Sequence, residues 1–201
     1  MTGSRAPQQK SSPGDPNSAI GLAPLTSPAV DRLTATLLSA RDGDDQALAA
    51  AIRLAQPEVA RFLRTLVNPA DLEDVVQDTF VRAYRALPRY RGDACGRTWL
   101  LTIARRAAAD ATRRVVRRRR TDEQAIPAGS TDTAIDSTHA LRALVDGLDP
   151  ERREAFVLTQ IVGCSYAEAA AICGVAIGTI RSRVARAREV LVEQVHAARS
   201  A

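Results

Sequence analysis

Apolar side chains recur three and four positions apart through most of this 201-residue chain. That spacing is typical of one buried face of an α-helix. It predicts a first helix from about Val30, a turn at residues 42–45, and a second apolar stripe that includes Leu48 and Ile52. Pro57 is predicted to start a new helix at its first position, where its missing N–H group is not needed. The pattern therefore favours an all-α fold.

The most regular repeat predicts a long helix over residues 71–87, with Asp71 at its N-cap. Its apolar positions are Leu72, Val75, Val76, Thr79, Phe80, Ala83, Tyr84 and Leu87. Its outer face begins with four acids, which are Asp71, Glu73, Asp74 and Asp78. Acids at a helix N-terminus complement the helix dipole, and an acidic face also suits docking to a basic protein surface. The sequence leaves both interpretations open.

A basic helix is predicted from Arg97 to about Arg118, with Trp99 in its apolar stripe. From residue 105 to residue 120 the chain carries eight arginines and a single acid, Asp110. A helix face that only meets water normally mixes both signs of charge. The excess of arginine therefore favours an anionic polymer as the partner of this helix.

Residues 165–189 predict a helix-turn-helix. Ser165 and Glu168 form a capping box at the start of the first helix, and Gly174 supplies the left-handed residue that ends it. The second helix has an inner face of Ile177, Ile180, Val184, Ala187 and Leu191, and an outer side of Thr179, Arg181, Ser182, Arg183 and Arg186. Such an outer side suits recognition of bases and phosphates in a DNA major groove. A solvated basic helix is the simpler alternative.

Proline and charge divide the chain into four segments. Residues 1–29 hold half of the ten prolines and predict a disordered tail. Residues 121–138 hold four acids and no base, and predict a flexible acidic linker. Two helical domains, residues 30–120 and 139–201, remain on either side of the linker.

Composition narrows the class of partner. Of 28 basic residues 27 are arginine, and the formal net charge is +5; clustered arginine suggests a nucleic-acid partner. The three cysteines and two histidines lack the spacing of metal ligands, so the sequence predicts no metal site and no cofactor. Neither a signal peptide nor an uninterrupted apolar span is recognised, which predicts a soluble, cytoplasmic protein without membrane insertion.

Three runs stand in an order and spacing that resemble the extracytoplasmic-function (ECF) class of bacterial RNA polymerase sigma factors. They are DLEDVVQDTFVRAYRALPRYRG, RTWLLTIARRAAAD and LDPERREAFVLTQIVGCSYAEAAAICGVAIGTIRSRVARARE. The resemblance covers roughly residues 30–195, and the last run most resembles the actinobacterial sigma factor C subgroup. It implies two helical domains, called region 2 and region 4, in a protein that is not an enzyme.

The resemblance also implies a role for each surface. The acidic helix would dock to the largest subunit of core RNA polymerase through Asp71, Asp74, Gln77, Asp78 and Arg82. The basic helix would bind and melt the minus-ten promoter element through Arg105, Arg106, Asp110, Arg113, Arg114 and Arg117. The helix-turn-helix would recognise the minus-thirty-five element through Thr179, Arg181, Ser182, Arg183 and Arg186. The implied partners are the largest and second-largest polymerase subunits, promoter DNA as duplex and as melted single strand, and an anti-sigma factor as a candidate inhibitor.

One position departs from the family pattern. The family commonly has Asn after the Ile-Ala-Arg triplet, where it helps to hold a flipped base, whereas Arg106 follows Ile103-Ala104-Arg105 here. The identity of the base preferred at the minus-ten element therefore stays open.

Two other functions are weighed against this one. A free-standing helix-turn-helix repressor or activator usually binds a palindrome as a dimer, and no dimerisation helix or ligand domain is recognised in the sequence. An enzyme acting on nucleic acid would need a metal cluster, a phosphate-binding loop or a nucleophile with its base. None of these motifs is recognised either.

Overall fold

The computed structural model describes residues 28–121 and 143–200, and these two ranges contain helices and turns but no strand. The first range forms α1 (Pro28–Arg41), α2 (Asp45–Arg64), α3 (Leu72–Ala86) and α4 (Gly96–Thr121). The second forms α6 (Pro150–Phe156), α7 (Tyr166–Cys173) and α8 (Ile177–Ser200). The all-α prediction is confirmed. The predicted tail and linker lie outside the described residues, apart from residues 28, 29 and 121.

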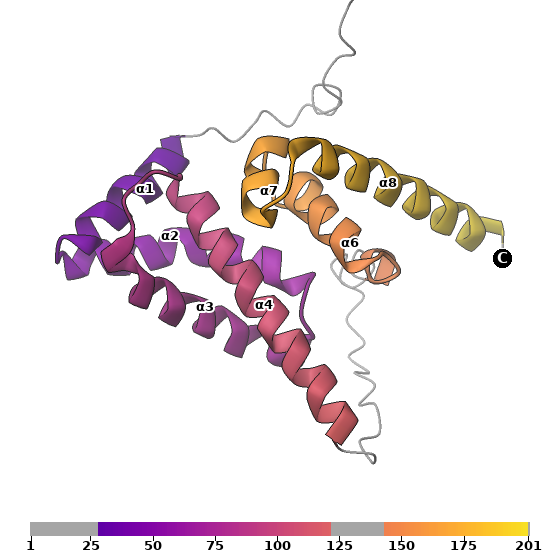
Figure 1. The fold of residues 1–201 in the computed structure, drawn as a ribbon, viewed down its shortest axis with the longest axis horizontal. Helices are drawn as coiled ribbons and strands as arrows, with labels where there is room; N and C mark the ends of the chain where they lie inside the picture. The colour runs from indigo at the N-terminus through magenta and orange to yellow at the C-terminus, as the bar shows by residue number, and fades with distance from the viewer. Residues whose placement is uncertain (1–27, 122–142, 201) are drawn as a thin grey trace, which may run out of the picture.

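Helices α1 to α4 form one packed group, in which α4 contacts each of the other three (Figure 1). Its centre is made by fully buried side chains of α2 and α4, with Phe62 and Leu63 at 0% and Leu101 at 1% exposure. Short 3-10 turns, Pro69–Asp71 and Leu87–Arg89, stand at the two ends of α3. The group holds the predicted acidic and basic helices side by side.

The predicted helix start at Pro57 is wrong, because α2 runs unbroken from Asp45 to Arg64 with Pro57 inside it. Proline removes one backbone hydrogen bond from a helix interior. Pro57 and Arg53 both lie on the exposed side of α2, where water can satisfy the carbonyl group that proline leaves without a donor. Ala55 and Val59 are buried on either side of Pro57, so core packing holds the helix together across it.

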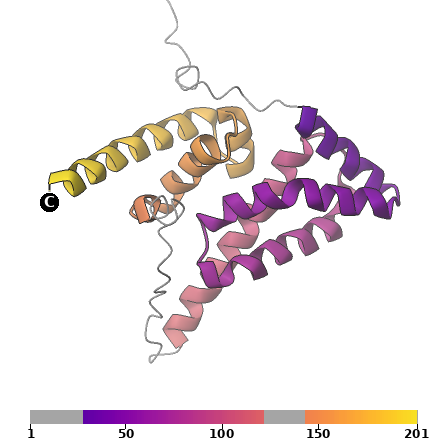
Figure 2. The same ribbon diagram turned by 180° about the vertical axis from the view of Figure 1, so that it is seen from behind.

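Helices α6, α7 and α8 form the second group. Asp149 caps α6 by accepting from the backbone N–H of Glu151 at 3.0 Å, and Pro150 follows at the first helical position, as expected from the sequence. A π-helical turn, Val157–Ile161, continues α6. Helix α8 packs on both α6 and α7 and extends well beyond them towards the C-terminus (Figures 1 and 2).

The two groups are in contact through α4 and α7, which lie next to each other in both views (Figures 1 and 2). One apolar core runs without a break from Leu33 of α1 to Val184 of α8. Arg97, 4% exposed, lies within this contact and donates to the carbonyl oxygen of Val162 at 2.7 Å. The described parts of the two predicted domains therefore pack against each other.

Candidate nucleic-acid interface

The helix-turn-helix is built as its sequence predicts. The Ser165 hydroxyl accepts from the N–H of Glu168 at 3.2 Å, and the Glu168 carboxylate accepts from the N–H of Ser165 at 2.8 Å. Gly174 has φ 68°, a left-handed conformation that ends α7 and that side chains with a Cβ rarely adopt. Helix α8 then begins at Ile177, where the sequence placed it.

The inner face of α8 is confirmed for Ile180, Val184 and Ala187, which are buried to 1% exposure or less. Leu191 is half-buried against a smaller apolar cluster. Ile177 is 42% exposed, so its predicted place in the inner face is wrong. It lies in the first turn of α8, whose neighbouring residues are also exposed, and this turn is not covered by the core.

The outer side of α8 presents a mixed polar and basic surface. Arg181, Ser182 and Arg186 are exposed, and Thr179 is half-buried. Ser182 donates to the Thr179 carbonyl oxygen at 3.0 Å, which fixes its hydroxyl close to the helix. Arg183 differs from the other two arginines, because its side chain is 18% exposed and pairs with Glu151 of α6. Of the five predicted residues, Arg181, Ser182 and Arg186 are therefore accessible to a groove of DNA.

The exposed side of α4 carries most of the predicted minus-ten residues. Arg106 and Arg117 are exposed, and the side chains of Arg113 and Arg114 are 73% and 51% exposed. Arg105 is different, since its Nε donates to Glu154 of α6 at 2.6 Å. Burial opposes the charged form of Arg105, but the hydrogen bond and the negative charge of Glu154, with smaller contributions from Cys173, together outweigh burial and raise the pKa of Arg105.

Asp110 is the one acid on this side of α4, and it contacts arginines of two helices. It accepts from Arg82 of α3 at 2.5 Å and from Arg113 at 2.5 Å. Both hydrogen bonds lower the pKa of Asp110, and the one from Arg82 has the larger effect. Asp78 of α3 accepts from the Nε of Arg82 at 3.0 Å and lies 3.5 Å from Arg114. The structure thus joins residues that the sequence divided between a polymerase surface and a DNA surface.

The remaining polymerase candidates lie on the open side of α3. Asp74 and Gln77 are exposed, while Asp71 is half-buried and stands at the N-cap position without a side-chain capping bond. Val81 is 40% exposed and Tyr84 is 62% exposed. Tyr84 was predicted in the inner stripe of α3, and its exposure contradicts that placement, because it borders the core instead of entering it. Val81 stands outside the predicted apolar stripe, and its exposure agrees with that position.

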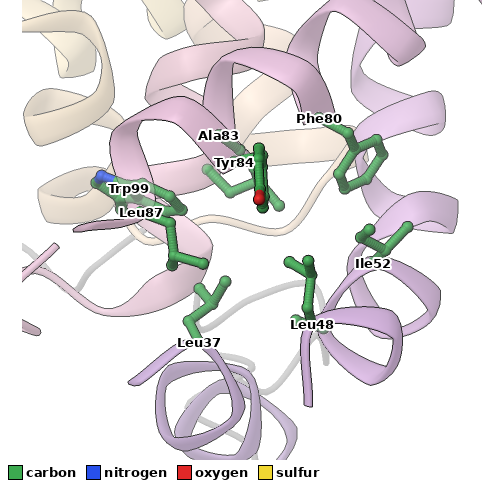
Figure 3. A pocket seen from close by; sticks show the side chains of 10 residues that line it. Leu37, Leu48, Ile52, Phe80, Ala83, Tyr84, Leu87 and Trp99 are labelled. Carbon is green, nitrogen blue, oxygen red and sulfur yellow. The ribbon is translucent and has the colours of Figure 1, made fainter. Parts of the chain in front are cut away.

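Beneath Tyr84 lies a small apolar hollow of about 20 Å³ (Figure 3). Leu37, Leu48 and Ile52 face Phe80, Tyr84 and Leu87 across it, and Trp99 closes one end. Trp99 packs against the core as predicted, with its ring centroid 4.7 Å from that of Tyr90. The hollow has room for about one water molecule, so it is too small to be a ligand cavity.

The three cysteines are free thiols. Burial raises the pKa of Cys164 and of Cys173 to about 12 in each case. In the two described ranges no group of three His, Cys, Asp or Glu side chains could hold a metal ion. The described helices also include none with the length and apolar character needed to cross a membrane.

Comparison with known families gives two matches. Residues 51–120 match the model of Sigma-70 region 2, and residues 138–191 match the model of Sigma-70, region 4. The first match covers α3 and α4, and the second covers the helix-turn-helix.

Similar proteins cover most of the chain. The ECF RNA polymerase sigma factor SigC of Mycobacterium tuberculosis is 42% identical over 167 residues, which are 81% of this chain and 90% of that protein. The ECF RNA polymerase sigma-E factor of Escherichia coli K12 is 34% identical over 171 residues, covering 76% of this chain and 88% of that protein.

Two solved structures share the fold. CnrH, solved in complex with the cytosolic domain of CnrY, has a TM-score of 0.65 and 30% identity, and the match covers 84% of this chain and 98% of that one. RpoE of Bartonella quintana, solved with the anti-sigma factor NepR, has a TM-score of 0.64 and 29% identity, and the match covers 74% and 96%.

Proposed function

The chain belongs to the extracytoplasmic-function class of RNA polymerase sigma factors, and we propose which of its residues carry that function. It binds core RNA polymerase and directs promoter-specific transcription initiation. Region 2 recognises and melts the minus-ten element, and region 4 recognises the minus-thirty-five element. RNA synthesis itself belongs to the polymerase, so this subunit acts in the cytoplasm as a specificity factor and not as an enzyme.

The minus-thirty-five element is recognised by the outer side of α8. Arg181 and Arg186 donate to base edges or phosphates in the major groove, and Ser182 and Thr179 contact the backbone beside them. Arg183 lies at the edge of this surface, where Glu151 holds it. The observation that supports this role is the exposure of Arg181, Ser182 and Arg186 on one helix, whose opposite face is buried at Ile180, Val184 and Ala187.

The minus-ten element is bound by α4. Arg106, Arg113, Arg114 and Arg117 supply the exposed positive charge, which neutralises phosphates and attracts the strand. Arg105 takes part through the N–H groups that its ion pair with Glu154 does not occupy. Asp110 orients its arginine neighbours through the hydrogen bonds described above.

Core polymerase docks on the open side of α3. Asp71, Asp74 and Gln77 supply polar contacts to the largest subunit, and Asp78 lies at the edge of this surface. Val81 and Tyr84 add an apolar patch of the kind that is enriched at the centre of protein interfaces. Region 4 would contact the second-largest subunit. The complexes of CnrH with CnrY and of RpoE with an anti-sigma factor support an anti-sigma factor as a further partner.

A mobility-shift experiment tests this assignment against a free-standing repressor. A labelled promoter fragment is mixed with the chain, with core polymerase, or with both. A sigma factor gives a specific complex only with both components, whereas a repressor shifts the duplex alone. Asp74→Arg is the matching variant, and it should remove polymerase from a pull-down while the protein stays helical. Intact pull-down of polymerase by the folded variant would contradict the role given to α3.

A further inference from the structure

Six charged side chains meet at the seam between α3 and α4, where they line an open hollow of about 430 Å³. They are Asp78, Arg82, Asp110, Arg113, Arg114 and Arg117. Four arginines against two aspartates give the hollow an excess of positive charge. Two of the six residues come from α3, the helix whose open side was assigned to polymerase.

Arg82 is held in this hollow by carboxylates of both helices. Its Nε donates to Asp78 at 3.0 Å, its Nη2 lies 2.8 Å from the other oxygen of Asp78, and its Nη1 donates to Asp110 at 2.5 Å. The hydrogen bonds to Asp78 and then Asp110 raise the pKa of Arg82. The guanidinium is therefore fixed on the α4 side of α3, with one third of the side chain still exposed.

This orientation turns Arg82 away from the polymerase surface proposed above. Asp74, Gln77, Val81 and Tyr84 are exposed on the other side of α3, whereas Arg82 faces Asp110 of α4. A guanidinium has five N–H groups, and only some of them are taken by the two carboxylates. The remaining N–H groups can donate to an acceptor inside the hollow. Because the positive side chains of Arg113 and Arg114 lie beside it, we expect that acceptor to be an anion.

We propose that Arg82 is a promoter contact, which binds a phosphate of the DNA backbone in this hollow together with Arg113 and Arg114. Asp78 and Asp110 act as positioning residues for these guanidiniums. The proposal rests on the proposed binding of minus-ten DNA by α4, and it moves Arg82 from the polymerase surface to the DNA surface.

Asp78 and Asp110 lie on a surface that we propose binds phosphate, although an unpaired carboxylate would repel a phosphate. Each of them contacts more than one guanidinium: Asp110 accepts from Arg82 and Arg113, and Asp78 contacts Arg82 and Arg114. Long arginine side chains lose rotamer freedom when they bind. Holding them in place before DNA arrives lowers that cost, and a planar guanidinium fixed in this way suits a tetrahedral phosphate.

The test measures polymerase affinity and promoter affinity separately with reconstituted holoenzyme. Arg82→Ala should leave affinity for core polymerase unchanged. It should weaken promoter binding on the order of tenfold and make the slope of log affinity against log salt shallower by about 0.7–0.9, the value for one lost phosphate contact. Arg53→Ala is the control, because Arg53 is an exposed arginine of α2, outside the hollow and outside the polymerase surface proposed for α3. It should change neither quantity.

Arg82→Ala also removes one positive charge from beside Asp78 and Asp110, so the effect of net charge needs its own control. The double variant Arg82→Ala/Asp110→Asn keeps the formal charge of the hollow unchanged. Promoter binding that stays weak in the double variant supports a direct contact by Arg82. Return to native affinity and salt slope would assign the effect to net charge and overturn the proposal. Arg82→Gln, which keeps the stem of the side chain, serves if Arg82→Ala melts at a lower temperature.

Two further results separate this proposal from the proposed function. If Arg82→Ala lowers polymerase affinity and leaves the salt slope unchanged, Arg82 belongs to the polymerase surface and the proposal is wrong. Arg113→Ala tests α4 itself. If Arg113→Ala weakens the promoter complex and Arg82→Ala does not, only the role of Arg82 is overturned. If neither variant weakens the complex, the proposed binding of promoter DNA by α4 is wrong as well.

Discussion

Nη2 of Arg97 lies 2.6 Å from Oε1 of Glu58, and this ion pair stands where the two helical groups meet. The same nitrogen donates to the carbonyl oxygen of Val162, and Nη1 lies 3.5 Å from Glu168 of α7 without hydrogen-bond geometry. Burial opposes the charge of Arg97, but the hydrogen bond to Glu58 and the attraction of neighbouring groups, Glu168 among them, together outweigh burial and raise the pKa of the guanidinium. One side chain of α4 thus connects α2, α7 and the end of the π-helical turn.

We predict that Arg97→Met lowers the free energy of unfolding by about 2–4 kcal/mol, because it removes the buried partner of this ion pair and takes a donor away from Glu58 and from the Val162 carbonyl. Urea unfolding followed by circular dichroism measures the change. Arg53→Met, at an exposed position of α2, is the control and should stay within about 0.5 kcal/mol of the native protein. Equal stability of the two variants would show that the contact through Arg97 does not hold the groups together.

The buried thiols predict a pH dependence of stability. Burial raises the pKa of Cys164 and Cys173 from 9.0 to about 12. A raised thiol pKa in the folded state means that the protonated thiol stabilises the fold. This contribution is complete below pH 9 and is lost as the pH rises from about 9 towards about 12. The double variant Cys164→Ala/Cys173→Ala should therefore lose less stability than the native protein between pH 8.5 and pH 10.5, measured by urea unfolding.

Thiol labelling gives an independent check of the same burial. Cys95 is half-buried, whereas Cys164 is 0% and Cys173 is 8% exposed. At pH 8 a thiol reagent should modify Cys95 first and the other two only on unfolding, because the thiolate is the reactive form. Mass spectrometry of the labelled peptides identifies the site. Fast labelling of Cys164 in the native protein would contradict the packed core around it.

The local parts of the fold could be predicted from the sequence because their causes are local. Ser165, Glu168 and Gly174 make the helix-turn-helix through contacts over three residues and one left-handed backbone position. Ile180 and Val184 are buried because they share a helix face. These features need no knowledge of the rest of the chain.

The errors have a physical pattern. Pro57 disfavours a helix interior by its own chemistry, and tertiary packing of α2 overrides it. Tyr84 has the spacing of a core residue, but it lies at the margin of the apolar face, where periodicity cannot separate buried from exposed positions. Ile177 has the same spacing and lies one turn before the packed part of α8.

The candidate site was predicted as sets of residues, but not as their partners. Arg105 and Glu154 are 49 positions apart, and Arg82 and Asp110 are 28 positions apart. Such pairs depend on how α3, α4 and α6 pack, which a helical repeat in one segment does not determine. The sequence therefore showed that α4 is basic, while the structure shows which of its arginines are already held by acids.

For recognition of the minus-thirty-five element, Arg186→Ala should weaken promoter binding by about 1–3 kcal/mol and leave polymerase affinity unchanged. Arg186 is exposed on the side of α8 opposite to Val184. Binding of holoenzyme to fragments with native and altered minus-thirty-five elements measures both affinity and preference. Arg53→Ala on α2 is the charge-matched control. Native transcription by Arg186→Ala holoenzyme from a promoter that depends on this element would contradict the assignment of α8.

Promoter opening requires a side chain that holds an unpaired base, because unstacking a base costs about a few kcal/mol. Trp99 is an unsuitable platform, since it packs against the core and against Tyr90. Arg106 is exposed on α4, next to Arg105, whose guanidinium is held by Glu154. A flat guanidinium stacks on a base and contacts its phosphate. Arg106 is therefore the side chain of α4 that we expect to hold the base for which the family commonly uses Asn.

Arg106→Ala should slow formation of the open complex on the order of tenfold, in line with the value of about 1–3 kcal/mol for stacking on one base. It should also change the preference at one minus-ten base, which Arg113→Ala should not do. Permanganate footprinting detects the unpaired thymines, and transcription is compared on duplex templates and on templates with a pre-melted bubble. A bubble should restore transcription by Arg106→Ala, because the strands are already separated. If it does not, the defect lies in a step other than opening, and the capture of a base by Arg106 is wrong.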